Sequence, residues 1–208
     1  MLTEYFKRYT EIKTARLTFR RLKVEDASDM YEYASRPETT EYLLWRPHTD
    51  VSFTALLLKN LQRQYADGEF FDFAVIWNEN GKMIGTSGFT AYEPKDRTAE
   101  IGYVLNPDYH GRGIATECLS VMMDFAFTRL NVDRVECRYL VGNDASLRVM
   151  QKCGMTHEGI KGQYNVKGKY RDYGACAISK EEYFGMKKEI KYEVKLGRGL
   201  LYRLFHKN

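Results

Sequence analysis

The segment between residues 99 and 130 constrains the fold most, because a strand-like run, a glycine loop and a helical pattern follow one another in it. Ala99–Leu105 has the composition of a strand, and Gly111-Arg112-Gly113 follows the turn Asn106-Pro107-Asp108. Ile114–Leu130 then places apolar side chains on one side of a helix. Glycines let backbone N–H groups approach a ligand, and a helix N-terminus carries partial positive charge, so this loop can bind a phosphate.

Two common nucleotide-binding motifs do not fit this loop. A mononucleotide P-loop needs Lys and Ser or Thr directly after its last glycine, whereas Ile114-Ala115 follows Gly113. A dinucleotide-binding turn needs a third Gly or Ala where Thr116 stands, and an acidic residue at the end of the next strand, where Leu140 stands. Neither a nucleoside triphosphatase nor a nicotinamide-binding protein is therefore predicted.

Periodicity in the rest of the chain predicts an α/β fold. Arg16–Leu22 alternates in the manner of an exposed edge strand, and Asn80-Gly81 is a strong hairpin signal between two strand-like runs. The order of the elements predicts a single mixed, mostly antiparallel sheet flanked by helices, with one right-handed β-α-β crossover. The other expected helices are 25–34, 49–65 and 143–152, and the other expected strands are 71–77, 83–90, 132–140, 159–166 and 172–178.

The C-terminal residues differ from the rest in charge. Residues 186–208 carry seven basic and two acidic side chains, a net charge of +5, so a total of +4 leaves −1 for the other 185 residues. A near-neutral body is not that of a nucleic-acid binder, although the basic tail could contact an acidic partner such as RNA. Ile190, Tyr192, Val194 and Leu196 alternate with polar residues, as in a strand that Gly197-Arg198-Gly199 turns back on itself. We therefore expect a domain over residues 1–183 and a basic, hairpin-like extension over 184–208 that covers a sheet edge or contacts a second copy in a homodimer.

Cysteine usage and hydropathy indicate the compartment. The four cysteines, at positions 118, 137, 153 and 176, lack the spacing of zinc ligands or of a redox pair, so no metal is expected and the thiols should be buried or free. The first residues offer no apolar core for a signal peptide, and no segment approaches the length of a membrane span. A cytoplasmic protein without a membrane partner is the expectation.

Three motifs in the expected order carry a resemblance to a known family. The run from Glu100 to Glu117 closely resembles the acetyl-CoA motif of the GNAT N-acetyltransferases. Asn143-x-Ala145-Ser146-x-Arg148-Val149-x-x-Lys152-x-Gly154-Met155 is similar to the next segment of that family. Thr14-x-Arg16-Leu17-x-x-Arg20 resembles the opening of its ribosomal-protein N-acetyltransferase branch, and the likeness spans roughly residues 12–182. One departure is His110, where the family usually has Arg or Gln, and which can make phosphate binding pH-sensitive.

The resemblance implies a GNAT-like fold, acetyl-CoA as co-substrate and a set of site residues. Glu100 is the candidate general base, since its strand leads into the acetyl site, and the Ser146 hydroxyl should lie near the leaving sulfur. Tyr103, Tyr164 and Tyr173 are alternative acids for that sulfur. Trp45 lies in the loop where the family places its acceptor. The expected cofactor-binding residues are Tyr103, Val104, Leu105, His110, Gly111, Arg112, Gly113, Ile114, Ala115, Thr116, Asn143 and Arg148.

The predicted reaction is transfer of an acetyl group from acetyl-CoA to a primary amine, by direct attack in a ternary complex. We expect the acceptor to be the α-amine of a protein N-terminus, because its pKa near 8 makes deprotonation easier than for lysine. A small-molecule amine is the alternative acceptor. A non-catalytic acyl-CoA-binding or ribosome-binding module on the same fold, or an RNA-binding protein that works through the basic tail, would be a different class of protein.

Overall fold

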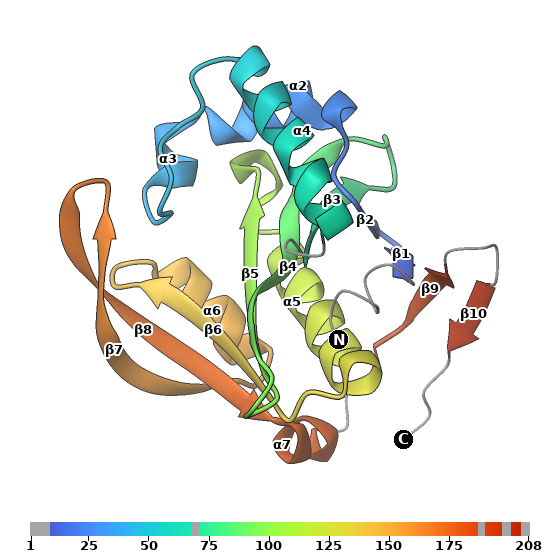
Figure 1. The fold of residues 1–208 in the computed structure, drawn as a ribbon. Coiled ribbons are helices and arrows are strands. Elements are labelled where there is room, and N and C mark those ends of the chain that lie inside the picture. The colour runs from blue at the N-terminus through green and yellow to red at the C-terminus, as the bar shows by residue number, and fades with distance from the viewer. Residues whose placement is uncertain (1–8, 68–70, 187–189, 197–200, 205–208) are drawn as a thin grey trace.

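The fold is built on one ten-stranded sheet, seen in a computed structural model that describes residues 9–67, 71–186, 190–196 and 201–204 (Figure 1). The strand order is β10-β9-β1-β2-β3-β4-β5-β6-β8-β7. The strands are β1 (Tyr9–Lys13), β2 (Leu17–Arg20), β3 (Phe71–Trp77), β4 (Met83–Glu93), β5 (Thr98–Leu105), β6 (Arg134–Leu140), β7 (Thr156–Val166), β8 (Lys169–Ser179), β9 (Tyr192–Leu196) and β10 (Leu201–Leu204). The helices are α2 (Ala27–Ala34), α3 (Pro37–Thr40), α4 (Val51–Asp67), α5 (Ile114–Phe125), α6 (Asp144–Lys152) and α7 (Lys180–Gly185), with short turns η1 (Val24–Asp26), η2 (Pro107–Tyr109) and η3 (Ala126–Leu130).

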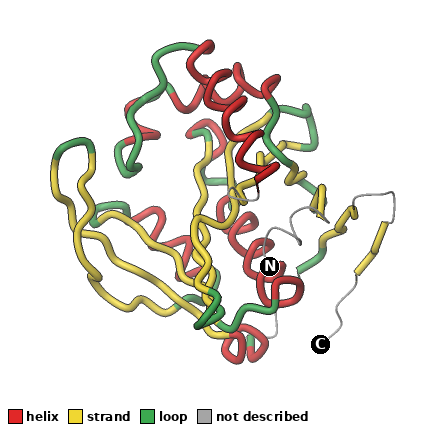
Figure 2. The backbone as a smooth tube through the Cα atoms, in the orientation of Figure 1, coloured by secondary structure: helices red, strands yellow, loops and turns green. Residues whose placement is uncertain are grey.

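Helices cover both faces of the sheet because its central strands are apolar on both sides (Figure 2). Along β3, Phe73 and Val75 join the core that α5 covers, whereas Ala74 and Ile76 join a second core under α2 and α4. Alternate residues of a strand point to opposite faces, so these two cores lie on opposite sides of the sheet.

The single parallel pair in the sheet, β5 with β6, is short. Its register covers only Thr98 with Arg134, Ala99 with Val135 and Glu100 with Glu136, after which the two strands separate (Figure 1). Strand β5 remains paired with β4 as far as Leu105, and β6 remains paired with β8 as far as Leu140. The sheet is therefore split beyond Glu100, with α5 connecting the two strands in the predicted β-α-β crossover.

Most of the expected elements are confirmed, and the differences have physical causes. The Arg16–Leu22 run is not an edge strand, because β1, which the sequence analysis did not predict, pairs with one side of β2 while β3 pairs with the other. The helix expected over 114–130 is α-helical to Phe125 and continues to Leu130 as a wider π-helical turn. Strand β9 forms from the alternating tail and covers β1, and β10 pairs with β9 as a hairpin. The turn expected at 197–199 lies outside the described residues.

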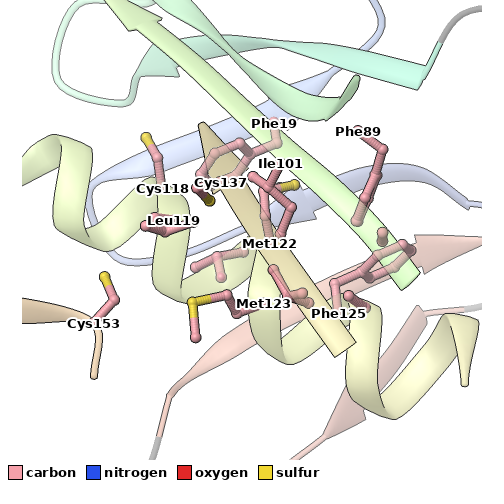
Figure 3. Packing of buried hydrophobic residues seen from close by; sticks show 14 of the residues in the cluster. Phe19, Phe89, Ile101, Cys118, Leu119, Met122, Met123, Phe125, Cys137 and Cys153 are labelled. Carbon is pink, nitrogen blue, oxygen red and sulfur yellow. The ribbon is translucent and has the colours of Figure 1, made fainter. Parts of the chain in front are cut away.

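The core between α5 and the sheet contains all four thiols, three of which Figure 3 labels. Cys118, Cys137, Cys153 and Cys176 are free and buried, as expected. Burial raises the pKa of Cys118 and Cys137 well above the usual range and that of Cys176 to about 11. Reactive thiols are exposed thiolates, so these cysteines should be inert in the folded protein.

We therefore expect the thiols of the native protein to react very slowly at pH 8 with a disulfide reagent that releases a chromophore. In concentrated urea all four thiols should react rapidly. Absorbance of the released chromophore measures both. A fast-reacting thiol in the native protein would contradict the burial.

A buried carboxylate ties the C-terminal elements to the body. Asp124 on α5 accepts hydrogen bonds from the hydroxyls of Tyr183 on α7, at 2.7 Å, and Tyr192 on β9, at 2.6 Å. Burial, and then the charge of Asp124, raise the pKa of both tyrosines, so both remain neutral donors. Among the helices in the described part of the chain, none is long and apolar enough to cross a membrane.

Candidate active site

A cavity of about 900 Å³ opens where β5 and β6 separate. Its walls come from both faces of the sheet: Leu57 and Leu61 of α4 lie on one side, and Ser146 and Met150 of α6 on the other. The cavity therefore passes through the split between the two strands. The structure brings together in its lining seven of the site residues predicted from the sequence: Trp45, Glu100, Tyr103, Val104, Asn143, Ser146 and Tyr164.

The free edge of β5 borders this cavity. From Ile101 to Leu105 the strand has no β6 partner, so backbone groups on that side face the split. Backbone N–H and C=O groups at a strand edge can hydrogen-bond an extended chain as a further strand would. Tyr103 and Val104 line the cavity, and Leu105 is buried beside them. This edge suits a linear ligand with amide groups.

Three polar side chains meet on the α6 side of the split. The Tyr103 hydroxyl lies 2.9 Å from the Ser146 Oγ. Asn143 caps α6, with its Oδ1 accepting the Ser146 N–H at 3.1 Å. The cap fixes Ser146 in the first turn of α6, and burial raises the pKa of Tyr103. The pair can pass a proton to a leaving group only with the tyrosine starting neutral.

Glu100 stands at the fork, as the last β5 residue paired with β6. A bulge places Thr90 of β4 as an extra residue opposite it, and the Thr90 hydroxyl donates to Glu100 Oε1 at 2.7 Å. Arg138 on β6 forms an ion pair with Glu100 Oε2 at 3.1 Å and lies over the Tyr173 ring. The predicted general base thus already has a cation and a hydroxyl as partners.

The floor of the cavity on the α4 side has an acidic residue that the sequence analysis missed. Asp72 of β3, Gly88 of β4 and Gly102 of β5 are in register across three strands, and Asp72 and Gly102 line the cavity. Desolvation raises the pKa of Asp72 to about 7, although its carboxylate accepts hydrogen bonds from the Phe73 N–H and the Thr86 hydroxyl. In the sequence Asp72 is one acid in an apolar run, and only the register shows its neighbours.

The glycine loop lies outside the cavity lining, at the start of α5. Gly111 and Gly113 have φ of +75° and +73°, in the left-handed region where a side chain would be strained, and the loop is exposed. Gly113 is the N-cap of α5, so unpaired N–H groups of the first turn point outward there. Ala115 and Thr116 are half-buried in that first turn, whereas Ile114 is buried in the core.

The N-terminal motif holds this loop from the side. The Arg16 guanidinium forms an ion pair with Glu117 of α5 and donates to the Arg112 carbonyl at 2.9 Å, and the Thr14 hydroxyl donates to Glu117 at 2.6 Å. In the sequence these residues form a motif, and nothing local to it indicates this contact. Thr14 and Arg16 thus help to position the glycine loop, although about 100 residues separate them from it in the chain.

Three predicted cofactor residues lie outside the cavity lining. His110 Nε2 is 3.1 Å from the Leu105 carbonyl, so that nitrogen carries a proton and the ring is held against the end of β5. Arg148 is exposed on α6 and does not line the cavity. Arg112 donates to the Asp108 carbonyl at 3.2 Å and lies over the Tyr109 ring. Within the part of the chain that is described, no group of three His, Cys, Asp or Glu side chains could hold a metal ion.

The outer wall of the cavity is aromatic and comes from the loop between α3 and α4. The Trp45 ring lies 5.2 Å from the ring of His48, whose Nδ1 is 2.9 Å from the Thr54 hydroxyl. Burial lowers the pKa of His48, which keeps it neutral. The tip of the β7–β8 hairpin reaches this loop, because Lys167 donates to the Thr40 carbonyl and Arg171 to the Glu41 carbonyl. The loop is thereby held over the sheet split.

Comparison with known proteins places this architecture. Residues 16–156 match the model of the acetyltransferase (GNAT) domain. The uncharacterized N-acetyltransferase p20 of Bacillus licheniformis is 33% identical over 173 residues, which cover 83% of this chain and 97% of the relative. A crystal structure of a GNAT-family acetyltransferase from Bacillus anthracis has a TM-score of 0.72 at 26% identity, with 83% of this chain and 99% of that chain covered.

Two more distantly similar proteins have names that state an acceptor or a bound ligand. The spermidine N(1)-acetyltransferase of Vibrio cholerae is 21% identical over 170 residues, which cover 81% of this chain and 96% of the relative. The ribosomal L7/L12 alpha-N-protein acetyltransferase RimL, solved in complex with coenzyme A, has a TM-score of 0.68 at 23% identity, with 80% of this chain and 95% of that chain covered. At that identity the second similarity concerns the fold alone.

Proposed function

The chain belongs to the GNAT acetyltransferase family and is an N-acetyltransferase, and from this we propose that it moves an acetyl group from acetyl-CoA to the α-amine of a protein N-terminus. The observation that carries the proposal is the cavity that passes through the β5–β6 split. A donor lying along the free edge of β5 and an acceptor entering from the α4 side would meet there. Direct attack in a ternary complex follows from that arrangement.

The residues fit coenzyme A at both ends. The exposed N–H groups of the Gly111–Ala115 loop, at the N-terminus of α5, suit a pyrophosphate, and the two left-handed glycines keep side chains away from it. The edge of β5 from Tyr103 to Leu105 suits the amides of pantetheine, with the Asn143 amide at the facing end of α6. When bound, acetyl-CoA supplies an activated acyl group as a thioester.

The Tyr103–Ser146 pair is our candidate for protonating the leaving thiolate. Ser146 starts α6 beside the split, and its Oγ lies 2.9 Å from the Tyr103 hydroxyl, so a proton given up by the serine can be replaced from the tyrosine. A thiol with a pKa near 8.5 needs little acid assistance. Loss of either hydroxyl should therefore slow the transfer without abolishing it.

The cavity wall favours a peptide terminus over a polyamine. A polyamine carries several cations, and each needs a charged partner when it is desolvated. Among the described residues that line this cavity, the carboxylates are Asp72 and Glu100, and Glu100 is already paired with Arg138. Most of the outer wall consists of apolar and aromatic side chains such as Trp45 and Phe53. One amine on an apolar body matches this composition.

The test combines binding and turnover. At a coenzyme A concentration 100 times its Kd, binding adds about 2.7 kcal/mol of stability, so the melting temperature of the protein should rise by roughly 5–10 °C. Acetyl-CoA plus a peptide with a free N-terminus should release thiol, and the same peptide with an acetylated N-terminus should not. Faster release with spermidine would replace the peptide by a small amine as acceptor. Binding without release from any amine would leave only a coenzyme A-binding module.

A further inference from the structure

Asp72 is a carboxylate of the cavity to which the transfer described above gives no part. On the basis of the proposed function, we propose that Asp72, and not Glu100, binds the ammonium group of the acceptor and takes the proton that it must lose before it attacks. The argument rests on the floor of the cavity, on the partners of the two carboxylates and on a buried hydroxyl beside Asp72.

The two strand positions next to Asp72 on the floor of the cavity are glycines and have no side chains of their own. Asp72, Gly88 and Gly102 are paired in register across β3, β4 and β5. Neighbouring strands lie about 4.8 Å apart, so the Cα of Asp72 is about 10 Å from that of Gly102. Gly102 lines the cavity, so an amine over Gly102 would lie between the Asp72 carboxylate and the edge of β5, where the acetyl group would be held.

Gly88 cannot carry a side chain in this arrangement. A Cβ there would lie 2.4 Å from the Phe71 carbonyl oxygen and 2.8 Å from Asp72 Oδ1. A Cβ at Gly102 would approach only the methyl of Thr90, at 2.8 Å. The space over Gly88 is thus taken by the Asp72 carboxylate, and Gly102 faces the cavity beside the Thr90 methyl.

The two carboxylates differ in their partners. Glu100 has the Arg138 guanidinium at 3.1 Å and the Thr90 hydroxyl at 2.7 Å, so an incoming ammonium would have to compete with a fixed cation. Asp72 has two neutral donors, the Phe73 N–H and the Thr86 hydroxyl, and no ion pair with a described residue. A carboxylate in a desolvated site without a cation needs a positively charged partner, and an ammonium ligand can supply that charge.

Tyr33 supplies the second, independent observation. Its side chain lines the same cavity and is only 1% exposed, and its hydroxyl has no hydrogen-bond partner among the described residues. A buried hydroxyl without a partner costs free energy of folding unless a ligand satisfies it. An ammonium carries three N–H donors, so it can donate both to Asp72 and to the Tyr33 oxygen.

The pKa of Asp72, about 7, suits this role, because a general base works best with a pKa near the working pH. Burial is the main cause of the shift, and no charged neighbour contributes to it. The titratable or charged side chains described on α2 and α4, which pack over this face of the sheet, are Asp29, Tyr31, Glu32, Tyr33, Lys59, Arg63 and Tyr65, and Glu32 is paired with Lys82. Those on the neighbouring segments are Asp26 paired with Arg20, Arg21 over the Tyr65 ring, His48, and Glu100 with Arg138.

The proton balance is complete with groups already named. The ammonium transfers one proton to Asp72 and becomes a neutral amine. The amine nitrogen forms a bond to the thioester carbonyl carbon, the carbon–sulfur bond breaks, and the nitrogen loses its second proton to the leaving thiolate, directly or through Ser146 and Tyr103. Asp72 then releases its proton to water, and the products are an amide, free coenzyme A and one proton.

The kinetic test uses Asp72→Asn, with Glu100→Gln as the matched control. In the wild-type protein, kcat/KM should fall below about pH 7 through a limb that stays in place with two acceptors of different amine pKa. Asp72→Asn should lose 10²–10⁴-fold in kcat/KM and lose this limb, because an amide side chain cannot take up the proton. Glu100→Gln should keep the limb. The reverse pattern would overturn the assignment.

A readout without turnover is the pH dependence of unfolding. A carboxyl whose folded pKa is raised from 3.8 to about 7 destabilises the fold progressively as pH rises through that window, by up to ~10³-fold in the folding equilibrium. Asp72→Asn should therefore melt at the same temperature as the wild type near pH 4 and several degrees higher at pH 8. Equal melting at both pH values would overturn the inference.

Tyr33→Phe tests the binding half of the inference. Its fold should be unharmed because the hydroxyl has no partner in the described structure. We expect KM for the acceptor to rise several-fold while the pH limb stays in place. An unchanged KM would show that the ammonium is not bound there. A wild-type protein that acetylates no amine would instead overturn the proposed function, whatever the melting curves of the Asp72 variant show.

Discussion

Replacing Gly102 by Val should lower kcat/KM for acetyl transfer by about 100-fold while the protein still folds and binds coenzyme A. Position 102 lies on the part of β5 that has no β6 partner, and it faces the cavity. A side chain there would occupy the space in which the acyl group and the amine approach each other. A displacement of about 1 Å in reacting groups is enough for a loss of that size.

The fold should accept this change because the obstruction is small. A Cβ at Gly102 meets only the Cγ2 of Thr90, the end of a side chain that can rotate, whereas a Cβ at Gly88 meets backbone of β3. Gly102→Ala is the graded control and should retain most of the activity. Gly185→Ala, at a position with nothing within 4 Å, should match the wild type.

Thiol release measures the activity of these variants, and the shift of the melting temperature with coenzyme A measures binding. The glycine loop does not line the cavity that Gly102 lines, so the shift should be preserved. Full activity of Gly102→Val would mean that the acceptor does not cross this part of the floor. Loss of the melting shift would mean that the side chain displaces the donor instead.

The second large effect concerns stability. Asp124→Ala should lower the free energy of unfolding by about 2–5 kcal/mol, because it leaves the hydroxyls of Tyr183 and Tyr192 buried without an acceptor. Urea unfolding followed by tryptophan fluorescence gives this number. The expected fall in melting temperature is roughly 5–15 °C.

A double-mutant cycle separates the two hydrogen bonds. Tyr192→Phe and Tyr183→Phe each remove one donor, and each should cost less than Asp124→Ala, by about 1–3 kcal/mol. In the background of Asp124→Ala, the same tyrosine changes should cost little or become stabilising. Loss of less than about 0.5 kcal/mol in Asp124→Ala would mean that these elements are held by apolar contacts alone.

The sequence predicted the parts of this fold that depend on local patterns. The strand, glycine loop and helix between residues 99 and 130 are recognisable because each has its own periodicity and the turn residues stand between them. Strand β1 escaped because Tyr9–Lys13 has no turn signal before it, and one of its partners, β9, comes from the far end of the chain. A short stretch of sequence around Tyr9–Lys13 contains no information about a partner strand so far along the chain.

The candidate site divides in the same way. Glu100, Tyr103, Asn143 and Ser146 were found because motifs carry them, and the structure gathers them at one cavity. Asp72 was missed because nothing in Phe71–Trp77 distinguishes a functional carboxylate from a polar residue of a strand. Its setting depends on two glycines in other strands, and therefore on register. The partner of Glu100, Arg138, was hidden for the same reason.

The pairing of β9 with β1 makes one side of the sheet depend on residues beyond 190. Any chain that stops short of them, as a nascent polypeptide does while still attached to the ribosome, presents the backbone of β1 to its surroundings. An open strand of this kind can recruit the same strand of another copy. Truncated forms should therefore self-associate. During expression at a high level, slower synthesis should reduce such association, because fewer unfinished chains are then present together.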